Sequence, residues 1–296
     1  MRIHSVVVAY RPDHGSLTAL CLALRRNASD VVVVDNTDDK SRSRFEAPEE
    51  CALIPLGRNA GVAEAFNVGI RHALDRGADA IVLFDQDSEI EDGFLARLVR
   101  PLRPGTPGVA APVARDKKTG REYPARRLGR FGGSANIFVD RQTGTEPVAV
   151  EIVISSGCAA TAVTFSEVGL MDEDFFIDFV DVEWCLRCRQ RGVKIVVVPD
   201  AAMAHSIGDT AVRTPLGLYR GIIHGPVRTY YKIRNSFLLA RKRHVPLLFA
   251  LHQVFSALAH NVIQLLFVKE RAVYLRTILV AVTHGLRGVT GKRAAA

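Results

Sequence analysis

The sequence is poor in cysteine and tryptophan, and its N-terminal residues do not predict a signal peptide. Its 296 residues include five cysteines, an odd number, and one tryptophan. That count argues against a disulfide framework, and the N-terminus shows neither the apolar run nor the cleavage site of a signal peptide. Cys185 and Cys188 form a CxxC pair, but no second pair or nearby histidine completes a zinc site. We therefore expect a cytoplasmic protein with both cysteines in its core.

Two common phosphate-binding loops are also missing. GxGxxG does not follow the first predicted strand, and GxxxxGK[ST] occurs nowhere. These absences argue against a dehydrogenase or an ATPase. The composition, 48% hydrophobic and 24% charged, is typical of a globular chain and excludes general disorder.

Acidic residues are almost absent from the C-terminal part. Residues 1–212 carry a net charge of −5, whereas residues 213–296 hold 14 basic side chains and one acid, Glu270, for a net charge of +13. We therefore expect a catalytic domain at 1–212 and a separate basic region at 213–296. Basic tails typically meet phosphate, on nucleic acid or an anionic membrane. Because residues 245–268 contain no charged side chain, we expect a membrane surface and no nucleic acid.

Two apolar helices are predicted in this region, at 245–268 and 273–286. In the first, His252, Ser256, His260 and Gln264 recur every four residues and form a polar stripe, so the helix is amphipathic. Two interpretations fit equally: a helix in the membrane interface, or a helix packed on the protein body or on a second copy in a homo-oligomer. A true membrane span fits less well.

Strand and helix patterns alternate along the first hundred residues. Apolar strands are predicted at 3–9, 31–34, 53–56 and 80–84, with helices at 17–27 and 61–76. This alternation predicts an α/β fold with a mostly parallel, Rossmann-like sheet and flanking helices. Ligands of such sheets bind at the carboxyl ends of the strands. Residues 103–133, rich in Arg, Pro and Gly, are predicted to form a surface loop or a β-excursion.

The triplet Asp85-Gln86-Asp87 follows the very apolar strand predicted at 80–84. Two carboxylates at a strand end can present oxygen ligands to Mg²⁺ or Mn²⁺, which can hold a diphosphate. The alternative is that Asp87 caps a helix predicted at 89–99.

The ordered motifs resemble the family 2 nucleotide-sugar glycosyltransferases with the GT-A fold, and within them the bacterial rhamnosyltransferases. The resemblance rests on AYRPD (9–13), VVVVDNT (31–37), GRNAGVAEAFNVGI (57–70), VLFDQDSE (82–89), SSGCAATAV (155–163), MDEDFFIDFVDVEWCLRCRQRG (171–192), VVPDAAMAHSIGD (197–209), YYKIRN (230–235) and HGLRGVTGK (284–292).

The resemblance implies roles for residues in these motifs. Donor contacts are implied for Tyr10, Asp35, Arg58, Asn59, Gly61, Asp85, Gly157 and Arg234, and ligation of Mg²⁺ or Mn²⁺ for Asp87 and His205. Arg234 would touch the donor diphosphate or a lipid phosphate on the acceptor. For Asp35 the alternative is a turn in which the carboxylate binds its own backbone.

The segment 172–183 holds six carboxylates in twelve residues, which raise one another's pKa values and suit a general base. By resemblance Asp181 takes the place of the catalytic aspartate. Asp178 is the fallback, because Val180 stands where many relatives have a glutamate. Glu183 and Arg187, four apart on a predicted helix, are expected to pair.

These features predict an inverting glycosyltransferase that moves L-rhamnose from dTDP-L-rhamnose to a hydroxyl of a surface glycan or a lipid-linked acceptor, such as a lipopolysaccharide precursor. We expect it on the cytoplasmic face of the inner membrane. The alternatives are a UDP-sugar transferase for galactofuranose or a hexose, and an inactive membrane-associated scaffold.

Overall fold

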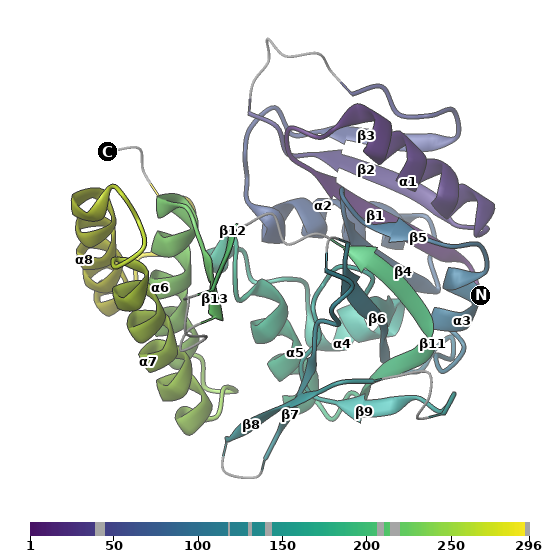
Figure 1. The fold of residues 1–296 in the computed structure, drawn as a ribbon. Coiled ribbons are helices and arrows are strands. Elements are labelled where there is room, and N and C mark those ends of the chain that lie inside the picture. The colour runs from purple at the N-terminus through teal and green to yellow at the C-terminus, as the bar shows by residue number, and fades with distance from the viewer. Residues whose placement is uncertain are drawn as a thin grey trace.

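The structure is a computed structural model of the 296-residue chain. It describes residues 1–38, 45–117, 119–129, 132–139, 144–205, 210–213 and 220–293. A sheet-containing part and three C-terminal helices stand side by side (Figure 1).

The large sheet has the strand order β3-β2-β1-β4-β10-β6-β11-β5, and β9 pairs with the first three residues of β11. The strands are β1 (Ile3–Ala9), β2 (Asp30–Asp35), β3 (Cys51–Pro55), β4 (Ala80–Asp85), β5 (Glu89–Ile90), β6 (Val109–Asp116), β9 (Val148–Val150), β10 (Ala159–Thr161) and β11 (Ile195–His205). The first four in sequence are parallel neighbours, as are β6 and β11, while β10 runs antiparallel to both of its partners. The predicted α/β class is confirmed.

Helices cover both faces of the sheet. Val7 and Val33 pack under α1 (His14–Arg26) and α3 (Phe94–Leu98). Their neighbours Val6 and Val32 point to the opposite face, where α2 (Val62–Asp75), α4 (Ala162–Val168) and α5 (Val180–Gln190) pack. Because side chains alternate along a strand, the continuous valine runs are what a sheet buried on both faces requires.

The structure corrects two local predictions. The segment 103–133 is not only a surface loop, since β6 is an interior strand and its residues 109–114 are buried. Pro112 is tolerated there because β10 is short and pairs only with Val109 and Ala110. The hairpin β7 (Ala125–Leu128) and β8 (Ser134–Ile137) follows outside the large sheet. No helix begins after Asp87; β5 follows, and α3 starts only after Gly93.

The C-terminal part holds the hairpin β12 (Thr210–Arg213) and β13 (Arg220–Ile223), then α6 (Pro226–Ala240), α7 (Leu247–Gln264) and α8 (Arg271–Arg287). Both apolar helices predicted here are therefore confirmed. Within the described ranges, no helix is long and apolar enough to cross a membrane.

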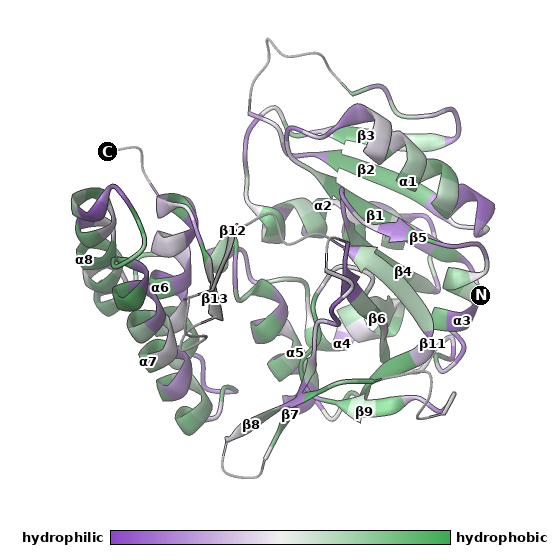
Figure 2. Cartoon of the chain, in the orientation of Figure 1, coloured by the Kyte–Doolittle hydropathy of each residue, from purple (hydrophilic) through white to green (hydrophobic). Residues whose placement is uncertain are grey.

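Helix α7 is amphipathic as predicted, and only part of its polar stripe is buried: Gln264 is buried and His260 half-buried, whereas His252 and Ser256 are exposed. Asn261 and Gln264 are each 1% exposed, whereas Phe255 is 71% exposed and Val262 55%. Figure 2 shows the hydrophobic colour along α7 and α8. Helix α7 therefore buries several polar side chains and exposes large apolar ones, unlike an ordinary surface helix.

Candidate active site

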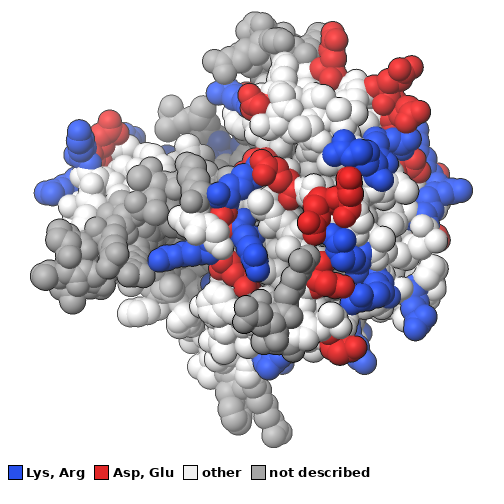
Figure 3. Space-filling view, turned by 45° about the vertical axis from the view of Figure 1, so that its right-hand side comes forward, with Lys and Arg blue, Asp and Glu red and all other residues white. Residues whose placement is uncertain are grey.

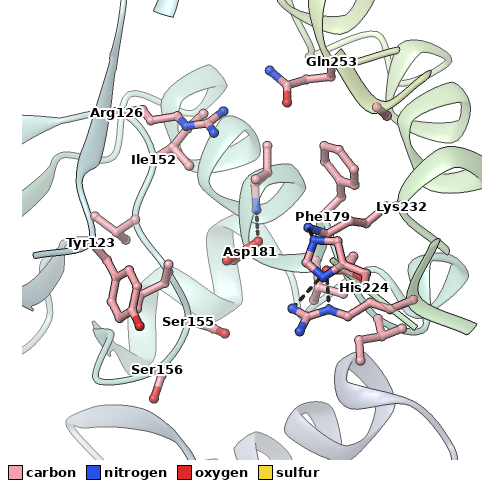
Figure 4. A pocket seen from close by; sticks show the side chains of 18 of the residues that line it. Tyr123, Arg126, Ile152, Ser155, Ser156, Phe179, Asp181, His224, Lys232 and Gln253 are labelled. Carbon is pink, nitrogen blue, oxygen red and sulfur yellow. Dashed lines mark hydrogen bonds and ion pairs between the residues drawn. The ribbon is translucent and has the colours of Figure 1, made fainter. Parts of the chain in front are cut away.

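A cleft of about 1110 Å³ separates the carboxyl edge of the sheet from the C-terminal helices. The sheet-containing part lines it with Asp85, Asp178, Asp181 and His205. It also contributes the loop that carries Ser155 and Ser156 (Figure 4). Helices α6 and α7 supply the facing wall, which includes Lys232, Gln253 and His260. Four of the residues singled out from the sequence thus meet in one cavity.

The other strand-end residues lie along the same edge of the sheet. The amide of Tyr10 donates to Gln86 Oε1 (2.6 Å), which ties the end of β1 to the end of β4. Asn59 Oδ1 accepts from the Gly61 amide (3.1 Å). Asp35 Oδ1 accepts from the Thr37 amide (3.0 Å), so the turn expected as its alternative role is present. A contiguous polar edge therefore runs from β3 to β4 beside the cleft.

Three further predicted donor contacts have clear local roles. Arg58 pairs with Glu64 in the first turn of α2. Gly61 has φ +90°, and a Cβ there would lie 2.5 Å from the Phe176 ring. Gly157 has φ +78°, and its Cβ would lie 2.4 Å from Met203 Sδ. Only glycine fits either place, because both the backbone conformation and the space exclude a side chain.

Asp85, Asp87 and His205 form a cluster in which Asp85 ends β4, Asp87 lies two residues later, and His205 ends β11. His205 Nδ1 lies 3.1 Å from Asp87 Oδ1, and its Nε2 lies 3.6 Å from Asp85 Oδ2. Burial works to lower the pKa of His205, but the contact with Asp87 and the charge of Asp85 outweigh it and raise that pKa. Burial raises the pKa of Asp85. For Asp87, burial is outweighed by His205, and its pKa lies below the usual value.

The chemistry of this cluster suits a divalent cation. Carboxylate oxygen and imidazole nitrogen are donors that Mn²⁺ accepts, and His205 is 12% exposed at the end of its strand. In the described part of the chain, no group of three or more His, Cys, Asp and Glu side chains is already arranged around a metal position. Asp87 and His205 instead contact each other. A cation bound here would have to compete with that contact, because an imidazole nitrogen binds a metal only when it carries no proton.

The acidic loop (residues 172–181) carries unusual backbone strain. Phe176 (φ 62°, ψ −62°) forms a tight turn in which the Ile177 amide donates to Phe175 O (2.7 Å). Asp178 and Phe179 also have positive φ, 62° and 65°. Non-glycine residues in such conformations cost about 1–3 kcal/mol each and persist where surrounding contacts impose them. The strained residues directly precede Asp181.

Asn235 of α6 supplies those contacts. Its Nδ2 donates to the carbonyl oxygens of Phe175 (2.8 Å), Ile177 (2.7 Å) and Asp178 (2.9 Å). Arg234 Nε donates to Asn235 Oδ1 (2.6 Å) and fixes the amide in this orientation. Helix α6 therefore fixes the backbone conformation of the acidic loop, which lies more than 50 residues earlier in the sequence.

Arg234 is not the ligand contact that the sequence suggested. It is fully buried, and its guanidinium donates to the carbonyls of Val289 (3.1 Å), Gly291 (2.9 Å) and Phe175 (3.2 Å). These bonds use the donors that a phosphate would need. Arg234 instead joins the residues after α8 to the acidic loop.

Asp181 and Asp178 differ in their surroundings. Asp178 pairs with Arg228, whose Nε lies 3.3 Å from Asp178 Oδ1. Asp181 sits in the first turn of α5, and its Oδ1 accepts from the Val182 amide (2.8 Å). Burial, with the charges of Asp178 and Asp85, raises the pKa of Asp181 to about 6. Since no arginine of the described ranges pairs with it, a carboxyl with that pKa is better suited to accept a proton than Asp178 is.

The predicted structural roles in α5 are confirmed. Arg187 Nε lies 2.7 Å from Glu183 Oε1. Cys185 and Cys188 are buried, and burial raises the pKa of each thiol. Residues 206–209 of the His205 motif lie outside the described residues.

Sequence reasoning missed several residues of the cleft. Ser156 Oγ accepts from the Asp85 amide (3.2 Å). Tyr123, just before β7, and Arg126 of β7 also line the cleft. Ser156 lies in the motif SSGCAATAV (155–163), but only Gly157 of that motif was predicted to contact the donor. Elsewhere, the face shown in Figure 3 mixes acidic and basic side chains and presents no continuous field of one sign.

Solved structures share this fold. Two of them are GalNAc-T7 with UDP, GalNAc and Mn²⁺ (TM-score 0.58, 15% identity, 96% of this chain and 57% of that one) and S. aureus TarS 1–349 in complex with UDP-GlcNAc (TM-score 0.56, 14% identity, 98% of this chain and 82% of that one). At these identities the likeness concerns the fold alone.

Sequence relatives are more informative. The dTDP-rhamnosyl transferase RfbF of Shigella flexneri is 39% identical over 293 residues, covering 98% of this chain and 97% of its own. The galactofuranosyltransferase GlfT1 of Mycobacterium tuberculosis is 28% identical over 215 residues, 70% of each chain. The family model "Glycosyl transferase family 2" matches residues 6–160. This chain belongs to glycosyltransferase family 2.

Proposed function

We propose that this glycosyltransferase moves L-rhamnose from dTDP-L-rhamnose to an acceptor hydroxyl with inversion at the anomeric carbon. The observation that carries the mechanism is Asp181, a carboxyl with a pKa of about 6 in the cleft that also contains Asp85 and His205. The donor sugar is inferred from RfbF, which matches over nearly its whole length. A UDP-sugar donor is the alternative, which the weaker similarity to GlfT1 supports.

In the proposed reaction the acceptor hydroxyl attacks the anomeric carbon while Asp181 removes its proton. The new glycosidic bond forms as the bond between that carbon and the diphosphate oxygen breaks, and dTDP leaves with the electron pair. Positive charge develops on the sugar ring during transfer. The nearby carboxylates of Asp85 and Asp178 favour that charge.

Asp87 and His205 would hold Mg²⁺ or Mn²⁺ in this proposal. When bound, the cation neutralises the negative charge of the diphosphate, an effect worth several kcal/mol. Tyr10, Asp35 and Asn59 would contact the nucleoside along the polar sheet edge, with Asp85 on the ribose side. Arg58, Gly61 and Gly157 would shape that edge. We assign the donor functions and the catalytic base to residues 1–212, and attachment to a membrane surface to residues 213–296.

Calorimetric titration with dTDP, UDP and GDP, each with and without Mn²⁺, tests this proposal. We expect dTDP to bind most tightly, and removal of the metal or Asp87→Ala to weaken binding about 100-fold or more. The Asp92→Ala variant, which removes an exposed acid away from the cleft, is the control. Preference for UDP would change the donor but not the chemistry. Absence of binding to all three would leave the inactive scaffold.

We also propose that the enzyme attaches to the cytoplasmic face of the inner membrane. Helices α7 and α8 and their connection carry exposed apolar residues: Leu248, Leu251, Phe255, Val262, Leu266, Leu275, Leu279 and Leu286. Exposed cations, among them Lys269, Arg271 and Arg276, lie on the same segment. Apolar area next to cations favours an anionic lipid surface, whereas a symmetric homo-oligomer through this face would bring like charges together.

Flotation with phosphatidylglycerol-containing vesicles checks the membrane proposal. We expect Phe255→Ser combined with Leu266→Ser to reduce vesicle binding about tenfold or more, because each change removes apolar contact with lipid. Leu22→Ser, at a 45% exposed leucine of α1, is the matched control. Part of the wild-type binding should survive high salt, since the apolar contribution is not screened. Retained binding by the double variant would contradict the proposal, as would a stable dimer lost in that variant.

A further inference from the structure

We infer that the cleft contains a second anion-binding subsite, centred on Arg126, which binds a negatively charged group of the acceptor. The inference rests on the proposed function, because it assigns the class of acceptor. The chemistry concerned is that of an oxyanion, either phosphate or carboxylate.

The charges that line the cleft are divided between two regions. Carboxylates gather where the end of β4 meets the start of α5, with Asp85 on the strand and Asp178 and Asp181 at the helix. Of the basic side chains on the wall, Arg228 pairs with Asp178, whereas Arg121 and Arg126 come from the segment before and in β7, and Lys232 from α6. A sugar hydroxyl needs no such cations. A cleft with acids at one end and cations elsewhere suits a substrate that is itself charged.

Arg126 is held firmly, yet its side chain has no acidic partner. Its amide donates to Ile152 O (2.9 Å), and its carbonyl accepts from the amides of Glu151 (3.0 Å) and Ile152 (3.1 Å). The side chain is partly buried in the cleft wall. Among the described residues, no carboxylate forms an ion pair with it, whereas Arg100 and Arg187 each have one. A partly buried guanidinium without a counter-ion is costly, and an anionic ligand would supply that counter-ion.

The position of Arg126 favours the acceptor over the donor. In Figure 4, Ser156 and Arg126 lie on opposite sides of Asp181. Ser156 marks the donor end, because its hydroxyl contacts the Asp85 amide. An anion on Arg126 would therefore lie beyond the base, on the side from which the acceptor hydroxyl approaches. Gln253 of α7 faces Arg126 across the cleft and adds a neutral donor.

Two kinds of acceptor carry the required oxyanion. One is a glycan joined to a lipid through a diphosphate, and the other is a glycan that contains a uronic acid. A guanidinium can bind either group with two parallel hydrogen bonds. The structure assigns the shared chemistry, and the ligands in the experiment separate the two sources.

The test is calorimetric titration of the full chain saturated with Mn²⁺ and dTDP, so that the donor site is filled. The probes are farnesyl diphosphate, methyl galacturonide and the neutral methyl galactoside. We expect one anionic probe to bind the wild type, and Arg126→Ala to weaken its binding about 10–100-fold, as loss of a charge-assisted pair does. Arg126→Lys should restore part of the affinity, because lysine keeps the positive charge but cannot form the two parallel hydrogen bonds of a guanidinium.

The matched control is Arg127→Ala. Arg127 is the next residue of β7, it is exposed, and its guanidinium donates to Ala149 O (2.9 Å) outside the cleft. Affinity for dTDP should be unchanged in both alanine variants. Failure of both anionic probes to bind the wild type, or equal affinity in Arg126→Ala, would overturn the subsite. Failure of dTDP to bind the wild type would instead count against the proposed donor, and the probes can then be titrated without nucleotide.

Discussion

Replacing Asp181 with asparagine is expected to lower kcat by about 10²–10⁴-fold, the usual contribution of a positioned general base. Asparagine keeps the size of the side chain but cannot accept the acceptor's proton. Affinity for dTDP should stay within about twofold, since the change concerns the proton acceptor and not the polar sheet edge. Initial-rate measurements with a transfer assay, together with dTDP titration, check both values. Asp178→Asn should have a smaller effect on kcat, because Arg228 already engages that carboxylate.

The Asp181→Asn substitution should also stabilise the fold at neutral pH. Burial raises the pKa of Asp181 to about 6, above that of an unfolded carboxyl. Ionisation in the folded state therefore costs stability, and this cost grows as pH rises from about 4 to about 6 and stays constant above. Asp181→Asn should thus gain about 1–3 kcal/mol at pH 8 and nothing at pH 4, measured by urea unfolding. In the wild type, kcat/KM should fall below about pH 6 as the base is protonated. An unchanged kcat in Asp181→Asn would exclude this residue as the base.

Replacing Asn235 with alanine is expected to lower kcat about 10–100-fold and to destabilise the protein by about 3 kcal/mol. The substitution removes three hydrogen bonds to carbonyls of the strained acidic loop. Without them the left-handed conformations of Phe176, Asp178 and Phe179 can relax, and Asp181 moves from its position.

Asn235 is a positioning residue, so its test needs a readout that general instability does not change. Hydrogen exchange should rise in residues 175–181 more than in β1 or β4. Below the unfolding transition, the lost activity should appear in kcat and not in dTDP affinity. Val227→Ala, at a 69% exposed residue of the same helix, is the control and should leave both unchanged. Uniformly faster exchange over the whole chain would mean that Asn235 only stabilises the fold.

The first half of the fold was predictable because its strands are continuous apolar runs. Val6–Val8 and Val31–Val34 are buried on both faces of the sheet, and such runs have few alternatives to a central parallel strand. Strand β6 was not predictable in the same way. Its sequence contains three alanines and Pro112, and it becomes a strand through pairing with β11, more than 80 residues away. Tertiary contacts here override local propensity.

The site divides along the same line. The polar residues at strand ends could be predicted, since parallel strands bring their carboxyl ends to one edge. Asp181 was found through the family resemblance. The prediction for Arg234 was wrong because an arginine in a sequence that resembles a nucleotide-sugar enzyme is readily taken for a phosphate ligand. In the structure its guanidinium donates to backbone carbonyls instead. The neighbouring Asn235 was overlooked, because its partners lie about 60 residues earlier and no local pattern reports such contacts.

The exposed apolar residues of α7 have a consequence for substitution along this helix. Gln253 and Asn261 line the cleft, whereas Leu251, Phe255 and Val262 are exposed. We expect exchanges among apolar residues at the exposed positions to leave sugar transfer unchanged, and changes at the cleft positions to alter which acceptors the enzyme takes. A lineage that adopts a different glycan can thus diversify the cleft positions of this helix and leave the exposed apolar positions untouched.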